Sequence, residues 1–316
     1  MSRPSTPLPL DLLDVPFRTR DALDLGVAPG RLRGRGLATP FATVRAPAGQ
    51  LDAHRIATAF ALRQGADQVV SHTTALALWG APLPRRIQQQ RELHVSSIGT
   101  ARPRTRLTIP HLVYPERIVV TLLGDLQIVD PATSWVQSAP LLGLDDLVAA
   151  GDFLITGTEP FDDVPPLTDL MGLRRAVARN AGGRGVKRAR EALELIRYGP
   201  LSRRESFLHL MFWRGRLPRA EANFTVRDAA GRAVHMLDAA HVEFQVGTEY
   251  ESLLHLDPAK FRRDIRKQHE LASLGWELHR LTSDDVDPRL RTPASRAALA
   301  RIRTSLLARG WHPFRE

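Results

Sequence analysis

Apolar residues recur at helical spacing through much of the front half of the chain, and shorter alternating stretches separate them. Helical spacing covers residues 51–65, 71–80 and 130–155. Strand-like alternation covers residues 92–99 and 106–115. The pattern predicts a small α/β domain over residues 49–155, in which Ser71 can cap a helix that ends at Gly80. A stretch rich in proline and aspartate follows, and residues 156–199 are predicted to form a linker and a basic amphipathic helix.

The pattern of residues 1–48 predicts a helix, a turn and a second helix. Thr19 can cap a helix that stops at Gly26, and "APGRLRG" predicts a second short helix with Pro29 in its first turn. "LATPFATVRAP" then predicts a small hairpin or wing. A helix of this kind would turn its arginines toward a DNA groove or phosphates. A helical cap that binds nothing fits the same geometry equally well.

Residues 200–316 predict a different order of elements. A capped helix comes first, and "ANFTVRDAAGRAVHMLDAA" then forms two strands around a glycine turn. A third strand, "FQVGTEYES", leads to a long helix with Asp257 as its cap and Gly275 at its end. A further strand, "WELHRLT", and a closing helix complete the pattern. The fold class predicted for the chain is therefore mixed α/β.

Composition narrows the classes of protein to which the chain can belong. An apolar share of 43% and a charged share of 25% are those of a globular protein, which argues against global disorder. The absence of cysteine excludes a disulfide scaffold, a thiolate nucleophile and any zinc site that uses cysteine. No apolar run approaches the roughly 20 residues that cross a bilayer. The amino terminus lacks the apolar core of a secretion signal, so a soluble cytoplasmic protein with no membrane partner is expected.

The net charge of +10 comes almost entirely from arginine, since Lys187, Lys260 and Lys267 are the three lysines. Basic residues gather in residues 18–45, 85–106 and 174–204. Such clusters attract polyanions, with nucleic acid first among them. For any one cluster, a solubilising surface is an equally good explanation.

Carboxylates nevertheless gather in one predicted hairpin of this basic chain. Glu249 and Glu251 point to the same side of a strand, and an antiparallel pairing would put Asp238 opposite Glu249. Carboxylates that converge repel each other unless a cation balances them, and oxygen ligands alone select Mg²⁺ or Mn²⁺. Such an ion activates water and binds a phosphoryl oxygen. Ordinary solvated strand residues would give the same spacing, and a capping box with Ser202 accounts for Glu205 without any chemistry.

Several of these stretches resemble the very-short-patch-repair-like endonuclease domain, a branch of the PD-(D/E)xK nuclease superfamily. The resemblance runs through "SRRES", "MLDAA", "TEYESLLH" and "FRRDIRKQHELASLGWELHRLT". It implies a nuclease-like α/β domain over residues 200–316, with a central mixed sheet flanked by helices. By the resemblance, Asp238 and Glu249 bind the metal, assisted by the Tyr250 carbonyl. Glu205 would orient a water, and His255 would assist proton transfer.

The resemblance also assigns basic residues, and the sequence departs from it at two positions. Arg263, Arg266 and Arg280 belong to the helix–strand signature beside the site and are expected to face phosphates. The superfamily's lysine, two residues after the metal-binding glutamate, is Glu251 here, and Ser252 follows where the branch has glycine. A longer acidic side chain at this position can displace the ion or crowd the DNA backbone. The role of Glu251 in the predicted catalytic set is therefore left open.

The front of the chain resembles the AbiEi family of type IV toxin–antitoxin antitoxins. "PFRTRDALDLGVAPGRLRG", "SHTTALALWGAPLP" and "QIVDPATSWVQSA" carry this resemblance over about residues 10–155. It implies a winged helix followed by an α/β domain, repression of the protein's own operon and a cognate toxin-like partner. The residues expected to contact DNA are Arg18, Arg20, Arg31, Arg33 and Arg35. Basic residues are sparse in the predicted wing.

Three functions follow as hypotheses. The first is a DNA-associated protein whose endonuclease domain hydrolyses phosphodiester bonds with Mg²⁺ or Mn²⁺. The second is a non-catalytic, antitoxin-like transcriptional regulator with a degenerate nuclease fold, whose DNA binding falls with salt and needs no metal. The third is a protein-interaction scaffold with no affinity for nucleic acid. The sequence does not identify the target DNA, the strand preference or the oligomeric state.

Overall fold

The computed structural model describes residues 7–34, 36–49, 51–99, 105–158, 164–251 and 258–313, with side chains from residue 265 onward in the last range. The chain divides into two compact units. The first unit comprises Met1–Leu142 and Leu170–Arg190, and the second comprises Gly143–Asp169 and Glu191–Glu316. The expected boundary at residue 155 does not coincide with this division, because α6 (Leu144–Thr156) packs on α10 (Arg203–Arg214) of the second unit and α8 (Leu170–Arg179) packs on α5 (Pro131–Ser138) of the first.

The first unit begins with a three-stranded antiparallel sheet in the order β1-β3-β2. Its strands are β1 (Phe17–Arg18), β2 (Leu37–Ala38) and β3 (Val44–Pro47). The β2–β3 pairing confirms the predicted hairpin. The helix α1 (Thr19–Asp24) packs beside this sheet over an apolar core, and the chain leaves it through Gly26, whose φ of 80° favours glycine. The cap prediction is wrong, since Arg18 is the N-cap residue and no side chain bonds the first turn.

The second helix of the front region differs most from the expectation. "APGRLRG" forms a single 3₁₀ turn, Arg31–Arg33, flanked by Gly30 and Gly34. The glycines raise the entropic cost of a helix, and three residues are too few to repay nucleation. A turn of this length does not supply a helix that could lie along a DNA groove, so the prediction of a second helix is wrong and a winged helix is not confirmed.

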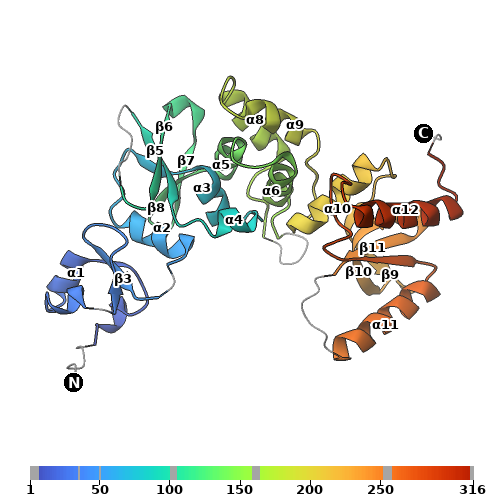
Figure 1. The fold of residues 1–316 in the computed structure, drawn as a ribbon, viewed down its shortest axis with the longest axis horizontal. Helices are drawn as coiled ribbons and strands as arrows, with labels where there is room; N and C mark the ends of the chain where they lie inside the picture. Colours follow the sequence, from blue (N-terminus) through green and yellow to red (C-terminus); the bar gives the residue numbers. More distant parts are fainter. Residues whose placement is uncertain are drawn as a thin grey trace. The chain divides into compact units, whose positions relative to one another are not determined.

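The rest of the first unit is a mixed five-stranded sheet in the order β6-β5-β4-β8-β7, with helices packed against it (Figure 1). The strands are β4 (Gln68–Val70), β5 (Leu93–Ile98), β6 (Thr108–Val113), β7 (Val120–Leu123) and β8 (Leu126–Val129). The helices are α2 (Ala53–Ala61), α3 (His72–Leu78), α4 (Arg85–Gln88), α5 and α8, and α9 (Val186–Leu193) spans the boundary with the second unit. The strands and helices predicted over residues 51–138 are confirmed. Within the described part of the chain, none of the helices combines the length and hydropathy that a bilayer crossing requires.

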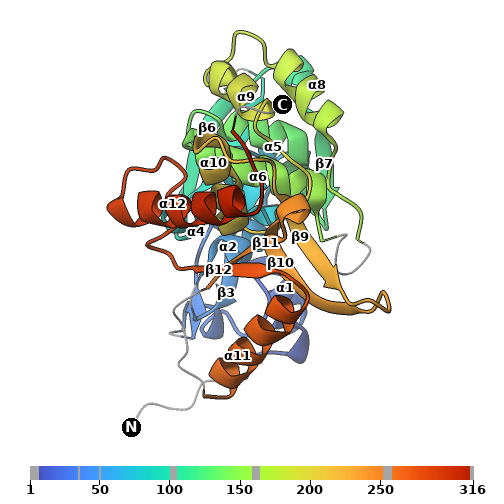
Figure 2. The ribbon, with the colours of Figure 1, turned by 90° about the vertical axis from the view of Figure 1, so that its right-hand side faces the viewer.

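The second unit has helices on both faces of a mixed sheet in the order β12-β11-β10-β9 (Figures 1 and 2). The strands are β9 (Glu221–Arg227), β10 (Ala233–His241), β11 (Val246–Tyr250) and β12 (Glu277–Leu281). β12 runs parallel to β11, and the other neighbours are antiparallel. Helices α10 and α12 (Pro293–Ala308) cover one face, and α11 (Pro258–Ser273) covers the other. The predicted order of elements and the mixed sheet flanked by helices are confirmed.

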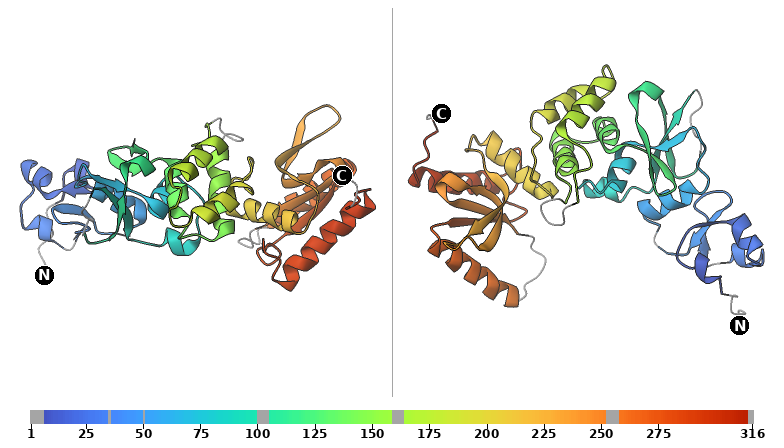
Figure 3. Two further views of the ribbon diagram at one scale, coloured as in Figure 1. Left: turned by 90° about the horizontal axis from the view of Figure 1, so that it is seen from above. Right: turned by 180° about the vertical axis from the view of Figure 1, so that it is seen from behind.

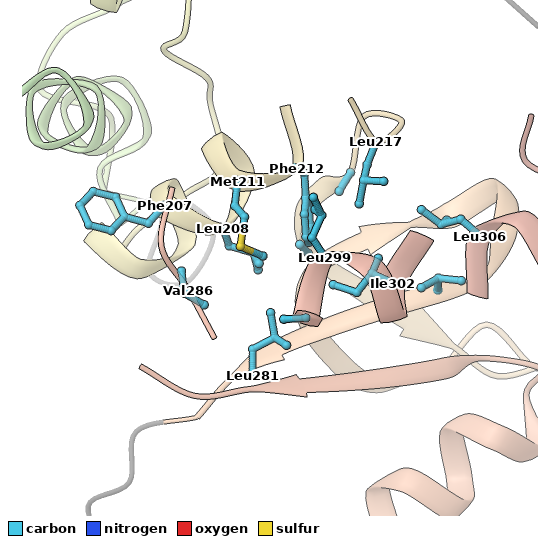
Figure 4. Packing of buried hydrophobic residues seen from close by; sticks show 14 of the residues in the cluster. Phe207, Leu208, Met211, Phe212, Leu217, Leu281, Val286, Leu299, Ile302 and Leu306 are labelled. Carbon is cyan, nitrogen blue, oxygen red and sulfur yellow. The ribbon is translucent and has the colours of Figure 1, made fainter. Parts of the chain in front are cut away.

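Each face of this sheet has its own apolar core. The α10–α12 face buries Leu208 and Met211 against Val246, Leu281 and Ile302 (Figure 4). The α11 face buries Leu271, and Trp276 just beyond the helix, against strand residues Val226, Leu237 and Ala240. The β9–β10 hairpin extends from the sheet as a two-stranded ribbon (Figure 3).

Truncation of Leu208 to alanine is expected to lower the free energy of unfolding of the second unit by about 2–5 kcal/mol, because this side chain is fully buried at the centre of the larger core. Urea denaturation followed by circular dichroism measures the change. Leu307→Ala is the matched control, since Leu307 is 43% exposed on α12. Equal losses in the two variants would contradict the placement of the core.

Candidate active site

The second unit carries an irregularity where β10 and β11 separate. The two strands pair in register up to Ala239 opposite Thr248. Beyond that pair, the Tyr250 amide donates a 2.7 Å hydrogen bond to Asp238 Oδ2, where a continued antiparallel ladder would use a main-chain carbonyl. On the neighbouring strand, Asn223 has a φ of 49°, in the left-handed region. The sheet is therefore forked and distorted at the level of Asp238, and such irregularities re-aim side chains.

At this fork the carboxyl group of Asp238 is influenced by the charges of Glu205 and Glu249. Asp238 and Glu249 are the next residues beyond the Ala239–Thr248 pair, where the ladder between the two strands ends. The pKa of Asp238 is raised to about 6; burial is the largest cause and the negative charges of Glu205 and Glu249 also raise it, while the hydrogen bond from Tyr250 and the charge of Lys267 oppose them. The environment of Asp238 thus disfavours its ionised form, because too little positive charge lies near the carboxylate.

Lys267 of α11 is a cation that contacts Glu249 and acts on the charge of Asp238. Its ammonium donates a short hydrogen bond to Glu249 Oε1 and a 3.2 Å hydrogen bond to the Met236 carbonyl. The side chains of Lys267 and Glu249 are 23% and 16% exposed, so the ion pair is largely shielded from water. The nuclease superfamily that the sequence resembles has a lysine where this chain has Glu251, and the lysine that contacts Glu249 here, Lys267, comes from α11.

Glu251 and Arg280 pair with each other. The Arg280 guanidinium donates a short hydrogen bond from Nε to Glu251 Oε1, and both side chains are about one third exposed. The Glu251 amide donates to the Leu281 carbonyl at 2.7 Å, which extends the β11–β12 ladder by one residue. Arg280 thus pairs with Glu251, the residue that stands where the resembled nuclease superfamily has a lysine, and the charge expected to face phosphates is shared with a carboxylate.

Glu205 has two roles in the structure. The Glu205 amide donates to Ser202 Oγ at 3.2 Å, and Glu205 Oε2 accepts from the Leu201 amide at 2.9 Å, so the predicted cap at the start of α10 is confirmed. The same oxygen accepts from Asn223 Nδ2 at 3.0 Å. Glu205 is also one of the charges that raise the pKa of Asp238. The capping explanation is therefore confirmed, and the charge of Glu205 also acts on Asp238.

A pocket lined by two arginines and one glutamate, Glu221, adjoins Glu205 through Asn223. Its volume is about 630 Å³, and its lining includes Arg197, Arg219, His209 and Asn223. Burial lowers the pKa of Arg197, and the charge of Arg219 lowers it further, although Asp152 opposes them. Burial and these two arginines lower the pKa of His209 to about 3. Two guanidinium groups that repel each other favour an anion such as a phosphate.

A second arginine-lined pocket of the same unit, of about 600 Å³, has a different charge balance. Its arginines lie against carboxylates of the unit: Arg203 on Asp146, Arg289 on Asp145 and Arg291 on Asp287. Arg204 instead stacks over the Tyr250 ring at 5.4 Å, which brings its charge close to the fork. The pocket lined by Arg197 and Arg219 is consequently the better candidate for an anion.

Several predicted site residues fall outside what the structure describes. His255 lies in residues 252–257, and Arg35 is likewise outside the described residues. Arg263 belongs to α11, but its side chain is outside the described part. Arg266 is described and exposed on the same helix.

The predicted DNA-contacting arginines of the front region have mixed surroundings. Arg18 donates from Nε to the Leu62 carbonyl at 2.6 Å, at the end of α2. Arg20 is highly exposed and lies 3.9 Å from Asp24 one helical turn away. Arg31 is half-buried and Arg33 is exposed, both on the 3₁₀ turn. These side chains come from a turn and from the ends of short elements, so one helix face does not present them together.

Sequence analysis missed Lys267, Arg197, Arg219 and Asn223 as candidate site residues. A usable signal existed for Lys267, because lysine occurs three times among 44 basic residues and one of the three falls in the helix after the acidic strand. The other three residues lacked such a signal, since their association with Glu205 depends on the irregular backbone at Asn223.

Comparison of the chain with models of known protein families, with curated proteins and with solved structures gives no match.

Proposed function

We propose that the chain is a DNA-associated protein whose second unit hydrolyses phosphodiester bonds with the help of a divalent cation. The observation that carries the proposal is the group of Glu205, Asp238 and Glu249 at the strand fork, where burial and neighbouring negative charge raise the pKa of Asp238 to about 6. A cation at the fork would relieve this imbalance. The pocket lined by Arg197 and Arg219 supports a phosphate-containing substrate next to it.

The donor atoms at the fork fit a hard cation. Asp238, Glu249 and the Tyr250 carbonyl offer oxygen and no sulfur or imidazole, and this set favours Mg²⁺ or Mn²⁺ over zinc. Asp238 keeps its orientation through the hydrogen bond from the Tyr250 amide. When bound, such an ion makes a coordinated water more acidic and polarises a phosphoryl oxygen.

The other groups would act on the substrate directly. Glu205, held by Asn223 and the Leu201 amide, would orient the attacking water through its second oxygen. Lys267 would exchange its bond to Glu249 for one to the phosphate, where its charge stabilises the negative charge that develops. Arg197 and Arg219 would hold a neighbouring phosphate. His255 remains a proposed proton-transfer residue outside the described range.

A non-catalytic regulator is the second candidate, and the Lys267–Glu249 ion pair favours it. A lysine that neutralises Glu249 within the protein removes part of the need for a metal. The chain would then bind DNA through its arginines without cleaving it. Antitoxin-like repression, with a toxin-like partner, belongs to this candidate.

Two assays on the full chain separate the candidates. Supercoiled plasmid is incubated with protein and Mg²⁺ or Mn²⁺, and binding of DNA from upstream of the gene is measured by mobility shift with a chelator present. The nuclease proposal expects cleavage that the chelator stops. The regulator candidate expects a shift that persists in chelator, falls steeply with salt and is not accompanied by cleavage. Neither cleavage nor binding would reject both and leave the scaffold hypothesis.

The rate of cleavage is expected to depend on pH through Asp238. Its raised pKa, about 6, means that the carboxylate is mostly protonated below pH 6 and cannot hold a cation there. The rate should therefore fall about tenfold per pH unit below 6 and level off above 7, because one proton must leave. Initial rates at fixed Mn²⁺ from pH 5 to 8 measure this, and a flat profile through pH 6 would contradict the role of Asp238.

A further inference from the structure

Three histidines of the first unit meet in one place. His72 begins α3, His94 lies on β5 and His111 lies on β6. The His72 and His111 rings stack with centroids 3.8 Å apart, and His94 Nδ1 lies 2.8 Å from His111 Nε2. One nitrogen from each ring can be chosen so that all three lie within 4.8 Å of one another. In the described part of the chain, this is the group of three or more histidine, aspartate or glutamate side chains whose ligand atoms all lie within that distance.

Buried hydroxyl groups orient His72. Ser71 occupies the N-cap position of α3, but its side chain makes no cap hydrogen bond and instead lies 2.9 Å from His72 Nδ1. Ser96 donates from its hydroxyl to Ser71 Oγ at 2.8 Å, and Ser71 Oγ donates to the His94 carbonyl at 3.4 Å. If His72 Nδ1–H donates to Ser71 Oγ, every group in this network has its proper partner. The lone pair of His72 then resides on Nε2, and such an outer hydrogen bond commonly fixes the tautomer of a metal ligand.

The backbone at His72 is unusual as well. Its φ of 53° lies in the left-handed region, which side chains other than glycine rarely adopt. The His72 amide donates to Gln137 Oε1 at 3.3 Å, so a side chain of α5 holds this conformation. Local strain of this kind concentrates at functional sites. Packing alone gives no reason for a strained residue next to two further imidazoles.

One side of the group opens into a cavity. The cavity has a volume of about 470 Å³, and its lining includes His72, His111, Gln137, Arg117, Asn180 and Arg184. His94 is 4% exposed and is not among the residues that line the cavity. An ion held by the three rings would thus have protein ligands on one side and room for a fourth ligand on the other. Three protein ligands with an open position are typical of zinc sites that exchange a water or bind a substrate.

We propose that His72, His94 and His111 bind one transition-metal ion of the zinc class, with the fourth position open to the cavity. Nitrogen ligands select ions such as Zn²⁺ and Co²⁺ over Mg²⁺, so this site is distinct in chemistry from the oxygen-lined fork of the second unit. The two guanidinium groups of the cavity, Arg117 and Arg184, fit a small anion as the exchangeable ligand. To bind the ion, the stacked His72 and His111 rings would have to turn so that their nitrogen lone pairs converge, and the 2.8 Å contact between His94 and His111 would open.

Cobalt is the direct probe, because Co²⁺ in a tetrahedral site absorbs visible light and Zn²⁺ displaces it silently. The full chain, freed of metal with a chelator, is titrated with Co²⁺ and then with Zn²⁺. One equivalent of Co²⁺ is expected to give intense visible bands that one equivalent of Zn²⁺ removes. His111→Ala, at a half-buried ligand, should weaken binding by about a hundredfold or more, and Ser71→Ala, at a positioning residue, by about tenfold to a hundredfold.

Two controls keep the test specific. His54→Ala removes an exposed histidine of α2, and Glu249→Gln alters the fork, and both should leave the cobalt spectrum unchanged. If His111→Ala fails to fold, X-ray absorption of zinc in the unmodified chain replaces it, and scattering from three imidazoles is expected. The proposal would be overturned by any of three results: no one-to-one binding of metal, cobalt bands that survive in folded His111→Ala, or bound zinc without three imidazole ligands. The histidines would then be a packed polar cluster.

Discussion

Glu249→Gln is expected to lower the rate of plasmid cleavage by about a thousandfold, because the substitution removes one of the two carboxylates proposed to hold the cation, and a bound metal supplies several kcal/mol of transition-state stabilisation. Glutamine preserves the size of the side chain and can still accept from Lys267, so the local packing should survive. Cleavage rates at saturating Mn²⁺ measure the effect, and circular dichroism confirms the fold.

Glu243→Gln is the matched control for this variant. Glu243 is an exposed glutamate in the turn between β10 and β11, only a few residues away along the chain. The Glu243→Gln variant should cleave DNA at the rate of the unmodified protein. Cleavage that is equal in Glu249→Gln and in the unmodified chain would mean that the activity comes from another site or from a contaminant.

Lys267→Met is expected to lower cleavage by about a hundredfold, while Mn²⁺ binds at least as tightly as before. The lysine donates to Glu249 and competes with a cation for that carboxylate, so its removal should strengthen metal binding. The rate nevertheless falls if the ammonium stabilises charge that develops on the phosphate, since loss of one such donor costs about a hundredfold to a thousandfold. Calorimetric titration with Mn²⁺ and cleavage rates measure the two effects separately.

Lys187→Met provides the comparison, because Lys187 is an exposed lysine of α9 outside the fork. The opposite pattern, in which Lys267→Met cleaves DNA as fast as or faster than the unmodified chain, would show that the lysine blocks the fork. Lys267 would then mark a nuclease fold that has been converted to another use, and the regulator would become the better account.

Local signals in the sequence predicted the elements of the second unit well. Ser202 and Glu205 form a capping box that sets the start of α10, and Gly275 with a φ of 84° follows the end of α11. Alternation predicted the strands, and Asp238 and Glu249 follow directly beyond the Ala239–Thr248 pair. These features depend on residues near one another in the chain.

Features that depend on distant residues were not predictable in the same way. Ser71 had a capping position by its sequence, yet its hydroxyl contacts His72 because β5 brings Ser96 and His94 alongside. The division into two units also escaped prediction, since amphipathic helices such as α6 and α8 do not reveal which core they cover. Lys267 reaches Glu249 only through the packing of α11 on the sheet.

The front region shows how composition can mislead. Arginines within a short glycine-flanked stretch suggested a DNA-binding helix, but a 3₁₀ turn carries them. Arginine is a good helix former, yet the three glycines between residues 30 and 36 outweigh it. If this region contacts DNA, the contacts come from a turn and the adjoining hairpin, which favours phosphates over base edges.

The most direct test is a crystal structure of the chain soaked in Mn²⁺, with the ion located by its anomalous scattering. The nuclease proposal predicts a peak at the fork of β10 and β11, roughly 2.1 Å from oxygens of Asp238 and Glu249, with Lys267 turned away from Glu249. An empty fork in which Lys267 still bonds Glu249, at a Mn²⁺ concentration that supports cleavage by other nucleases, would contradict it.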